Sequence, residues 1–242
     1  MIEIRQLGLR CGSFELSGLN LSLKADDYAI LMGPTGAGKT SILEAICGLR
    51  RVLSGEIWLR DCDVTALTPA ERAVGYVPQD TALFTKMSVR ENLAYGLRMR
   101  HVKTLTVGRR VEQVAKLLGI SRLLGRRPHG LSGGEARRVA LGRAICFSPD
   151  VLMLDEPFAG LDESTREDVY KAIEIIHSAT PASVIHVSHD AKDVVRLANR
   201  LFTLQSGALM ETSIADLEEL EGRNRTTREV DPDREVSQPP AP

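Results

Sequence analysis

The sequence predicts an α/β fold, with a mainly parallel sheet, an antiparallel β layer at one edge and an inserted α-helical subdomain. Three observations predict it. Short apolar runs at residues 28–32, 151–154 and 183–187 are typical of parallel strands buried on both faces. Residues 2–9 instead alternate apolar and polar side chains, as half-exposed strands do. Residues 81–148, which lie between two of the buried runs, carry mainly helical patterns.

The bulk composition is that of an ordinary globular protein. The chain has 242 residues, 43% of them hydrophobic and 26% charged, enough for one domain or a domain with a subdomain. A net charge of −1 gives no reason to expect nucleic acid as the main partner. We find neither the roughly 18 apolar residues that cross a bilayer nor a signal-peptide pattern, so we expect a cytoplasmic location.

The four cysteines show no C-x-x-C spacing. We therefore expect buried, reduced thiols rather than disulfides or metal ligands. They are Cys11, Cys47, Cys62 and Cys146.

The first strands form the expected antiparallel layer. Residues 14–16 and 19–23 repeat the alternation of residues 2–9. Residues 55–59 read as a further short strand, followed by a polar turn over residues 61–65.

A glycine-rich loop follows the apolar run at residues 28–32 and precedes a helix expected over residues 39–47. It matches G-x-x-x-x-G-K-[ST], in which glycines let backbone N–H groups surround phosphate oxygens at a helix N-terminus. Lys39 would reach the terminal phosphates, and the Thr40 hydroxyl would hold a magnesium ion. The strand–helix context disfavours an ordinary glycine turn. The expected phosphate site comprises Gly33, Pro34, Thr35, Gly36, Ala37, Gly38, Lys39, Thr40 and Ser41.

The sequence allows two roles for each of two residues near this loop. Phe14 is the only aromatic residue before the strand of the loop, and it either stacks on an adenine ring or fills the core. Gln79 follows a strand expected over residues 74–77. It is either a solvated loop residue or a ligand-binding group at the carboxyl ends of the parallel strands.

The helical segment contains two helix starts. Ser88 and Glu91 form a capping box. Ser132, with two glycines behind it, begins a helix that we expect to reach about residue 147. The second start is either a simple N-cap or an anion site made of a hydroxyl, free amides and the positive helix end. One apolar stripe predicts core packing alone: Val107, Val111, Val114, Leu117 and Leu118.

Polar residues also end two later buried strands. Asp155 and Glu156 follow residues 151–154, and two adjacent carboxylates there are costly unless a cation or a reaction uses them. Asp155 fits a second magnesium anchor, and Glu156 could accept a proton from an attacking water. His189 follows residues 183–187 beside the expected nucleotide.

The C-terminal part ends in weaker patterns. Residues 200–204 and 208–210 predict a pair of strands, and residues 214–220 a short helix. The remaining residues, 221–242, are polar and proline-rich, which predicts disorder.

Taken in order, residues 33–40, Gln79, 131–135, 151–157 and His189 resemble the nucleotide-binding subunit of ATP-binding cassette (ABC) transporters. The likeness covers about residues 1–215.

Two further segments narrow the resemblance. Residues 77–84 and 92–98, with the short first strands and the glycine-rich loop, are most similar to importers of the molybdate/tungstate type.

The resemblance implies a division of the chain. It implies an ABC ATPase domain over residues 1–220, with a P-loop (RecA-like) core at about 1–84 and 149–220. The helical subdomain would occupy about 85–148, and residues 221–242 would form the tail.

The resemblance also implies roles for single residues. Glu156 corresponds to the catalytic glutamate, His189 to the switch histidine at the γ-phosphate, and Asp155 to the Walker B aspartate that holds Mg2+. Gln79 matches the glutamine that contacts Mg2+ and senses the membrane subunit. Lys39 is similar to the Walker A lysine.

Other residues would act on a second copy of the chain. Ser132, Gly133 and Gly134 resemble the family signature, which binds the γ-phosphate of ATP held by the opposite subunit. Asp162 lies in the loop that crosses the dimer interface. The resemblance therefore favours the anion-site reading of Ser132 and requires a dimer.

Some positions depart from the family pattern. Many members carry an adenine-stacking tyrosine where this chain has none, which leaves Phe14 or Arg10 as the candidate. Glu135 stands where glutamine is common. The longest importer subunits continue after the ATPase into a β domain that regulates transport. This sequence has a short polar tail at that place, so we expect no feedback by the substrate through such a domain.

The family implies ATP and Mg2+ as ligands and a peripheral place on the cytoplasmic face of the membrane. The implied partners are membrane permease subunits held near residues 84–95, a second ATP-binding subunit and, indirectly, a solute-binding protein. The alternatives are an ABC exporter subunit and a soluble, non-transport ABC ATPase.

Overall fold

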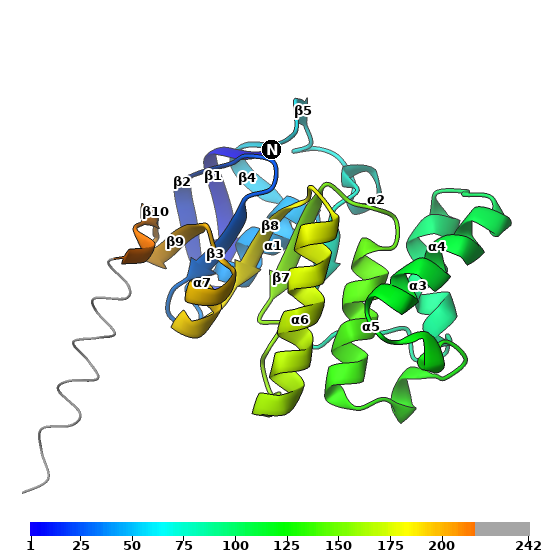
Figure 1. Cartoon of the computed structure of the whole chain (residues 1–242). Helices are drawn as coiled ribbons and strands as arrows, with labels where there is room; N and C mark the ends of the chain where they lie inside the picture. Colours follow the sequence, from blue (N-terminus) through cyan, green and yellow to red (C-terminus); the bar gives the residue numbers. More distant parts are fainter. Residues whose placement is uncertain (216–242) are drawn as a thin grey trace, which may run out of the picture.

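The computed structural model describes residues 1–215 as two β-sheets with helices between and around them (Figure 1). The expected α/β architecture is confirmed. In this described part, no helix is long and apolar enough to cross a membrane. The helix expected over residues 214–220 lies mostly outside the described residues, and the tail at 221–242 lies entirely outside them.

The smaller sheet is the antiparallel layer that the alternating segments predict. Its strands run in the order β2-β1-β4-β5. The segments at residues 14–16 and 19–23 prove to be one continuous strand, in which Gly18 adopts a positive φ of 67°. That irregularity breaks the alternation and hides the continuity in the sequence. The bounds are β1 (Ile2–Cys11), β2 (Phe14–Leu23), β4 (Val52–Leu59) and β5 (Cys62–Asp63).

The larger sheet runs in the order β10-β9-β3-β8-β7-β6. Its strands pair in parallel except for β10, which closes one edge in the antiparallel direction. Parallel pairs need crossover connections, and these are supplied by the helices on both faces. The bounds are β3 (Tyr28–Met32), β6 (Gly75–Val77), β7 (Val151–Asp155), β8 (Ser183–Val187), β9 (Arg200–Gln205) and β10 (Ala208–Thr212).

Helix α1 (Lys39–Cys47) lies between the two sheets and packs against β1 on one side and β7 and β8 on the other. Strand β3 contributes side chains to both hydrophobic cores because its successive side chains point to opposite faces of the sheet. Ala29 and Leu31 join the core around α1, whereas Tyr28 and Ile30 face the helices on the opposite side. A strand buried on both faces reads as one apolar run.

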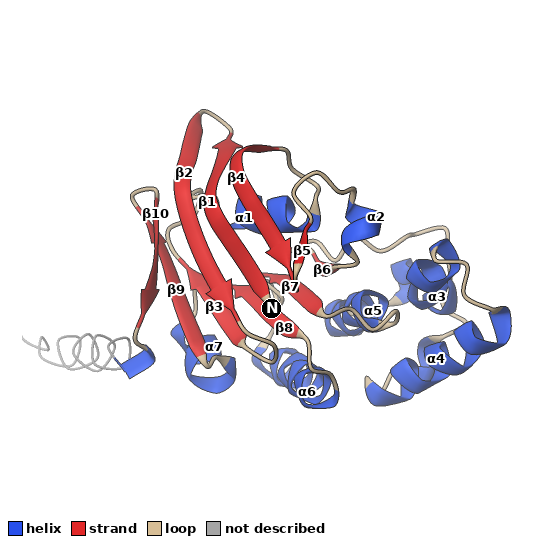
Figure 2. Ribbon diagram, turned by 90° about the horizontal axis from the view of Figure 1, so that it is seen from above, coloured by secondary structure: helices blue, strands red, loops and turns tan. Residues whose placement is uncertain are grey.

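Most of the remaining helices cover the other face of the larger sheet or extend beyond it, whereas α2 lies at the end of α1, where its Arg72 donates to the carbonyl oxygens of Ala45 and Ile46. Helices α3, α4 and α5 form a group beside β6, at the end of the molecule away from β9 and β10 (Figures 1 and 2). The bounds are α2 (Pro69–Arg72), α3 (Val89–Met99), α4 (Thr104–Leu117), α5 (Gly133–Ile145), α6 (Glu163–Ala179) and α7 (Ala191–Leu197), with short 3-10 turns at Ser121–Leu123 and Pro128–Gly130.

Two expectations about burial are wrong in part. Leu117, at the end of α4, is 36% exposed, so it does not continue the otherwise buried stripe of that helix. Cys62 is exposed because it lies in the two-residue strand at the edge of the antiparallel sheet. The other three cysteines are buried.

One buried titratable group, His186, makes the stability of the core depend on pH. His186 of β8 has no exposed surface, and its Nδ1 atom lies 3.0 Å from the Tyr28 hydroxyl. Burial lowers the pKa of His186 to about 4, while the nearby Asp193 carboxylate opposes this shift and Arg166 adds to it. The folded protein therefore holds His186 neutral where an unfolded chain would begin to protonate it.

We predict that replacing His186 by Gln flattens part of the pH dependence of stability. Between its ordinary pKa of 6.5 and about 4, the unfolded state binds more protons at this residue, so wild-type stability falls as the pH falls. This contribution amounts to about 3 kcal/mol over the whole range. Urea unfolding of both proteins at pH 7, 6, 5 and 4.5 measures it. A constant difference in unfolding free energy across that range would contradict the prediction.

Candidate nucleotide-binding and hydrolysis site

Four loops meet at the carboxyl edge of the larger sheet because they follow four parallel strands, β3, β8, β7 and β6. Ligands of such sheets bind in the crevice outside these strand ends. A cleft of about 490 Å³ lies there. It is lined by Thr35, Gly36, Gly38, Lys39, Thr40, Ser41, Gln79, Glu156 and His189.

The glycine-rich loop has a backbone that other residues would strain. Gly36 and Gly38 have φ angles of 80° and 103°, in the left-handed region that glycine tolerates. A Cβ atom on Gly38 would also come 2.8 Å from Leu16 of β2. Gly38 is the N-cap of α1, so the first N–H groups of the helix face the cleft without a side-chain cap. This arrangement suits a phosphate group.

Lys39 is only 7% exposed and is held by the loop itself. Its Nζ atom donates hydrogen bonds to the carbonyl oxygens of Gly33, at 2.7 Å, and Pro34, at 3.0 Å. The ammonium group thus sits inside the curve of the loop, at the floor of the cleft. An anion bound there would meet a charge that is already positioned and largely desolvated.

The Asp155 carboxylate lies at the end of β7 and is 2% exposed. Thr40 donates a hydrogen bond to its Oδ1 atom at 3.2 Å, and the Tyr76 hydroxyl lies 3.5 Å from Oδ2. Burial raises the pKa of Asp155, the hydrogen bond from Thr40 opposes this shift, and the charge of Glu156 adds to it. A buried carboxylate beside a hydroxyl is the hard oxygen donor set that Mg2+ prefers, so these residues fit that ion.

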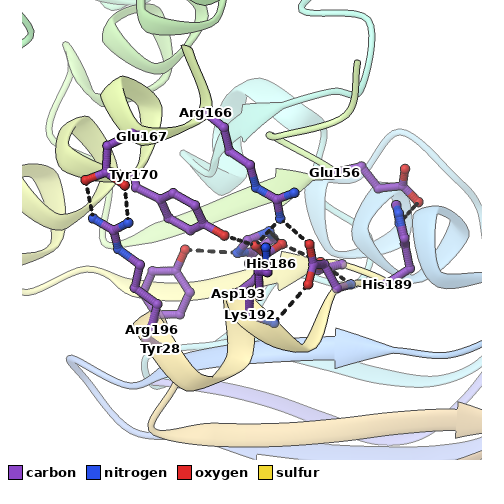
Figure 3. A network of polar contacts seen from close by, with 12 residues as sticks. Tyr28, Glu156, Arg166, Glu167, Tyr170, His186, His189, Lys192, Asp193 and Arg196 are labelled. Atoms are coloured by element: carbon purple, nitrogen blue, oxygen red, sulfur yellow. Dashed lines mark hydrogen bonds and ion pairs between the residues drawn. The ribbon is translucent and has the colours of Figure 1, made fainter. Parts of the chain in front are cut away.

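Glu156 lies between Gln79 and His189 in the cleft. Gln79 Nε2 donates to one of its carboxylate oxygens at 3.4 Å, and His189 Nδ1 lies 3.7 Å from the other. The Glu156 backbone adopts a positive φ of 44°, and its N–H donates to the carbonyl oxygen of Val187 in β8. This turn directs the side chain toward the cleft, while His189 remains 71% exposed (Figure 3). Strained backbone of this kind is common at functional sites.

Comparison with known families decides the identity. The family described as "ABC transporter" matches residues 16–159, more than half of the chain. The chain belongs to the ABC transporter family.

Curated relatives from the ABC family carry transport names. The "Molybdate/tungstate import ATP-binding protein WtpC" of Thermococcus kodakarensis is 40% identical over 82% of this chain and 60% of its own length. The protein of the same name from Archaeoglobus fulgidus is 40% identical over 84% of the chain and 82% of its length. A "Sulfate/thiosulfate import ATP-binding protein CysA" of Methylococcus capsulatus is 38% identical over 89% and 63%.

This ABC family chain spans about 60% of the length of the first of these relatives. A solved structure shares its fold: the ATP-binding cassette MJ0796, determined as a dimer in a post-hydrolysis state with ADP and Pi. The two agree with a TM-score of 0.77 at 24% sequence identity, over 88% of this chain and 99% of that one.

Several expected site residues of this ABC chain do not line the cleft. Ser132 caps α5, where its hydroxyl accepts a hydrogen bond from the Glu135 N–H and the Glu135 carboxylate accepts one from the Ser132 N–H. Gly134 packs so closely on Thr165 of α6 that a Cβ atom would lie 2.3 Å from its methyl group. Asp162 is the N-cap of α6, accepting from the Thr165 N–H.

Phe14 lies at the β1–β2 hairpin opposite Cys11 and is 40% exposed. The interpretation that it fills the core is therefore wrong. It does not line the cleft either. Arg10 pairs with Glu15 on the same hairpin, with its side chain largely exposed.

The sequence-based interpretation missed two arginines of α5 that hold the Gln79 loop. Arg137 donates to the carbonyl oxygens of Pro78 and Gln79, and Arg143 donates to those of Thr81 and Ala82. Arg137 is 4% exposed, although arginine side chains are rarely buried. One signal was available: α5 carries apolar residues all round, so its arginines cannot all reach solvent.

We predict that replacing Arg143 by Gln loosens the loop over residues 78–87. Thr81 and Ala82 both have positive φ angles, and Arg143 satisfies their carbonyl oxygens. Losing bonds from a charged donor should raise the opening of the loop, and hence tryptic cleavage after the exposed Lys86, by about tenfold. The control is Arg138→Gln on the same helix, which loses only an ion pair with Asp168. Equal cleavage of both variants would contradict this role.

Proposed function

We propose that this chain is the ATP-binding and ATP-hydrolysing subunit of an ABC importer. The observation that carries the proposal is the set of polar groups at the strand ends. Glu156 lies between Gln79 and His189, next to the Asp155–Thr40 pair and facing the glycine-rich loop. A triphosphate bound along this loop would place its outer phosphate toward Glu156.

Each residue of the cleft has a part in hydrolysis. Backbone N–H groups of the loop and Lys39 bind the phosphates and stabilise negative charge on the transferred group. Glu156 accepts a proton from the attacking water, which Gln79 and His189 help to position. When bound, Mg2+ would be held by Thr40, Asp155 and Gln79 and would supply positive charge against the phosphate oxygens.

The site is completed by a second copy of the chain. Ser132, Gly133 and Gly134 form a capped helix start that can bind an anion, yet they lie outside the cleft of their own chain. In the proposed dimer, this helix start closes over the γ-phosphate held by the partner. Asp162, at the start of α6, lies at the same interface. The dimeric state of the structural relative MJ0796 supports this arrangement.

The proposed assembly places two copies on the cytoplasmic face of the membrane, bound to permease subunits. The proposed domain division is the one that the resemblance implies, a core at residues 1–84 and 149–220 and a helical subdomain at 85–148 that receives the permease. The relatives named for molybdate/tungstate import support an oxyanion of that class as the solute, delivered by a solute-binding protein. Phe14 or Arg10 stacks on the adenine.

We predict that Glu156→Gln preserves ATP binding and stops hydrolysis. The amide keeps the shape and the contact with Gln79 but cannot take a proton, so the turnover rate should fall at least about 100-fold. Binding of a fluorescent ATP analogue and release of phosphate measure the two steps. Glu112→Gln, which alters an exposed carboxylate of α4 that pairs with Arg90, is the matched control. Hydrolysis at the wild-type rate in Glu156→Gln would refute its role as the base.

A second prediction concerns the dimer. Because Glu156→Gln traps unhydrolysed ATP, it should sediment as a dimer with ATP and as a monomer without it. Adding Ser132→Arg should block the dimer by placing a bulky side chain at the capped helix start, while binding of ATP to the glycine-rich loop persists. Dimers of the double variant with ATP would contradict the composite site.

Transport is tested by co-purifying the chain with its membrane subunit and its binding protein. In proteoliposomes, ATP hydrolysis should rise several-fold with molybdate or tungstate inside the binding protein and should not respond to phosphate. The Glu156→Gln complex is the control for background hydrolysis. Stimulation by an unrelated solute would reassign the substrate, and solute expulsion would favour an exporter.

A further inference from the structure

A buried carboxylate outside the cleft organises the segment that carries His189. Asp193, the third residue of α7, is 2% exposed, although it comes from a short surface helix. Its Oδ2 atom accepts a hydrogen bond from the Ser188 hydroxyl at 2.5 Å. Its Oδ1 atom accepts from Arg166 Nη2 at 2.7 Å and from the Tyr170 hydroxyl. A carboxylate held by three donors is fixed in both position and orientation.

The same network holds both neighbours of His189. Ser188, which donates to Asp193, accepts a hydrogen bond from the backbone N–H of Asp190 at 3.0 Å. The Asp190 carboxylate accepts from Arg166 at 2.6 Å. The backbone on each side of His189 is therefore tied to one arginine and one buried carboxylate, while the imidazole itself is free to face Glu156 (Figure 3).

The donors to Asp193 come from a different element. Arg166 and Tyr170 lie one turn apart on α6, whose N-cap, Asp162, ends the loop that follows Glu156. Phe158 of that loop packs on the Tyr170 ring, with centroids 4.1 Å apart, and Arg166 lies 5.3 Å from the centre of the Phe158 ring. Contacts with α6, and with the loop between Glu156 and α6, therefore fix the position of the His189 segment.

The buried charge of Asp193 depends on one cation, Arg166. Burying Asp193 is costly unless its charge is paired and hydrogen-bonded. Arg166 supplies the opposite charge. Burial lowers the pKa of its guanidinium, but hydrogen bonds with Asp193, Tyr170 and Asp190 outweigh this effect and raise the pKa. His186, whose Nε2 atom lies 3.8 Å from Asp193, is held neutral by burial. Arg166 is thus the cation in contact with Asp193, and its loss would leave a buried carboxylate unpaired.

We infer that Asp193, held by Arg166 and Tyr170, is a positioning residue that sets the place of His189 relative to Glu156 during ATP hydrolysis. The inference rests on the proposed function. Asp193 does not line the cleft. It lines a smaller pocket of about 240 Å³ that shares Glu156 and His189 with the cleft, and its carboxylate bonds to Ser188, so it acts through the Ser188–Asp190 segment. Disturbing it should slow the chemical step and leave nucleotide affinity unchanged.

The test compares Asp193→Asn with wild type in the full chain. The Asn side chain keeps the size of Asp but removes the charge that binds Arg166. We expect kcat to fall about tenfold and the Kd for a fluorescent ATP analogue to stay within about twofold. The matched control is Arg196→Gln. Arg196 makes the outer connection between α7 and α6, through Glu167 and Glu174, without contacting Asp193. Its loss should lower thermal stability and leave kcat within about twofold.

A double-mutant cycle separates positioning from general destabilisation. In a His189→Gln background, where the group to be positioned is missing, Asp193→Asn should cause no further loss of single-turnover rate. An equal tenfold loss in both backgrounds would overturn the inference, as would an Asp193→Asn variant with wild-type kcat. If Asp193→Asn fails to fold by circular dichroism, Tyr170→Phe removes one donor only and takes its place, with an expected loss of about threefold under the same criteria.

Different results would refute the proposed function and the inference about Asp193. A wild-type chain that binds nucleotide but does not hydrolyse it, or hydrolysis that is insensitive to His189→Gln, would refute the assignment of the site and the inference with it. Normal hydrolysis, lost on His189→Gln but retained on Asp193→Asn, would overturn the inference alone.

Discussion

Parallel pairing of β3, β8, β7 and β6 is the constraint on which the rest of the molecule depends. Parallel strands end at the same edge, so this pairing brings together loops that are more than 150 residues apart in the chain, from the glycine-rich loop to His189. The same pairing requires both faces of the sheet to be covered. Helix α1 covers one face, under the antiparallel layer, and the later helices cover the other.

Two of the loops at this edge are held by charged donors from helices. Arg137 and Arg143 of α5 bind carbonyl oxygens on both sides of the turn after Gln79. Arg166 of α6 binds two carboxylates that follow His189 in the chain, those of Asp190 and Asp193. In each case a guanidinium group offers several donors in one plane and can satisfy two acceptors at once. Residues with strained backbone, such as Thr81, are thereby held in place.

The helices that hold these loops also begin near the surface expected to meet a second copy. Ser132 is the N-cap of α5 and Asp162 is the N-cap of α6, and the two helix starts pack together through Gly134 and Thr165. A ligand-dependent contact at these helix starts would act on the same rigid elements that position Gln79 and His189. The arrangement gives the proposed dimer a physical route to the proposed hydrolysis site, through packed helices.

The sequence by itself determined the elements whose signals are local. The glycine-rich loop, the buried strands, the capping box at Ser88 and the helix start at Ser132 follow from backbone freedom, apolar runs and side chains that bond within three residues. From the order of its motifs it also predicted the family and the candidate residues of the cleft. Only the tertiary structure decided what depends on distant partners. The burial of Arg137 and Asp193, the exposure of Phe14 and Leu117 and the distances around Glu156 arise from contacts between segments far apart in the chain. Local periodicity carries no information about such contacts, because a polar side chain has the same place in the sequence pattern whether its partner is water or a buried acceptor.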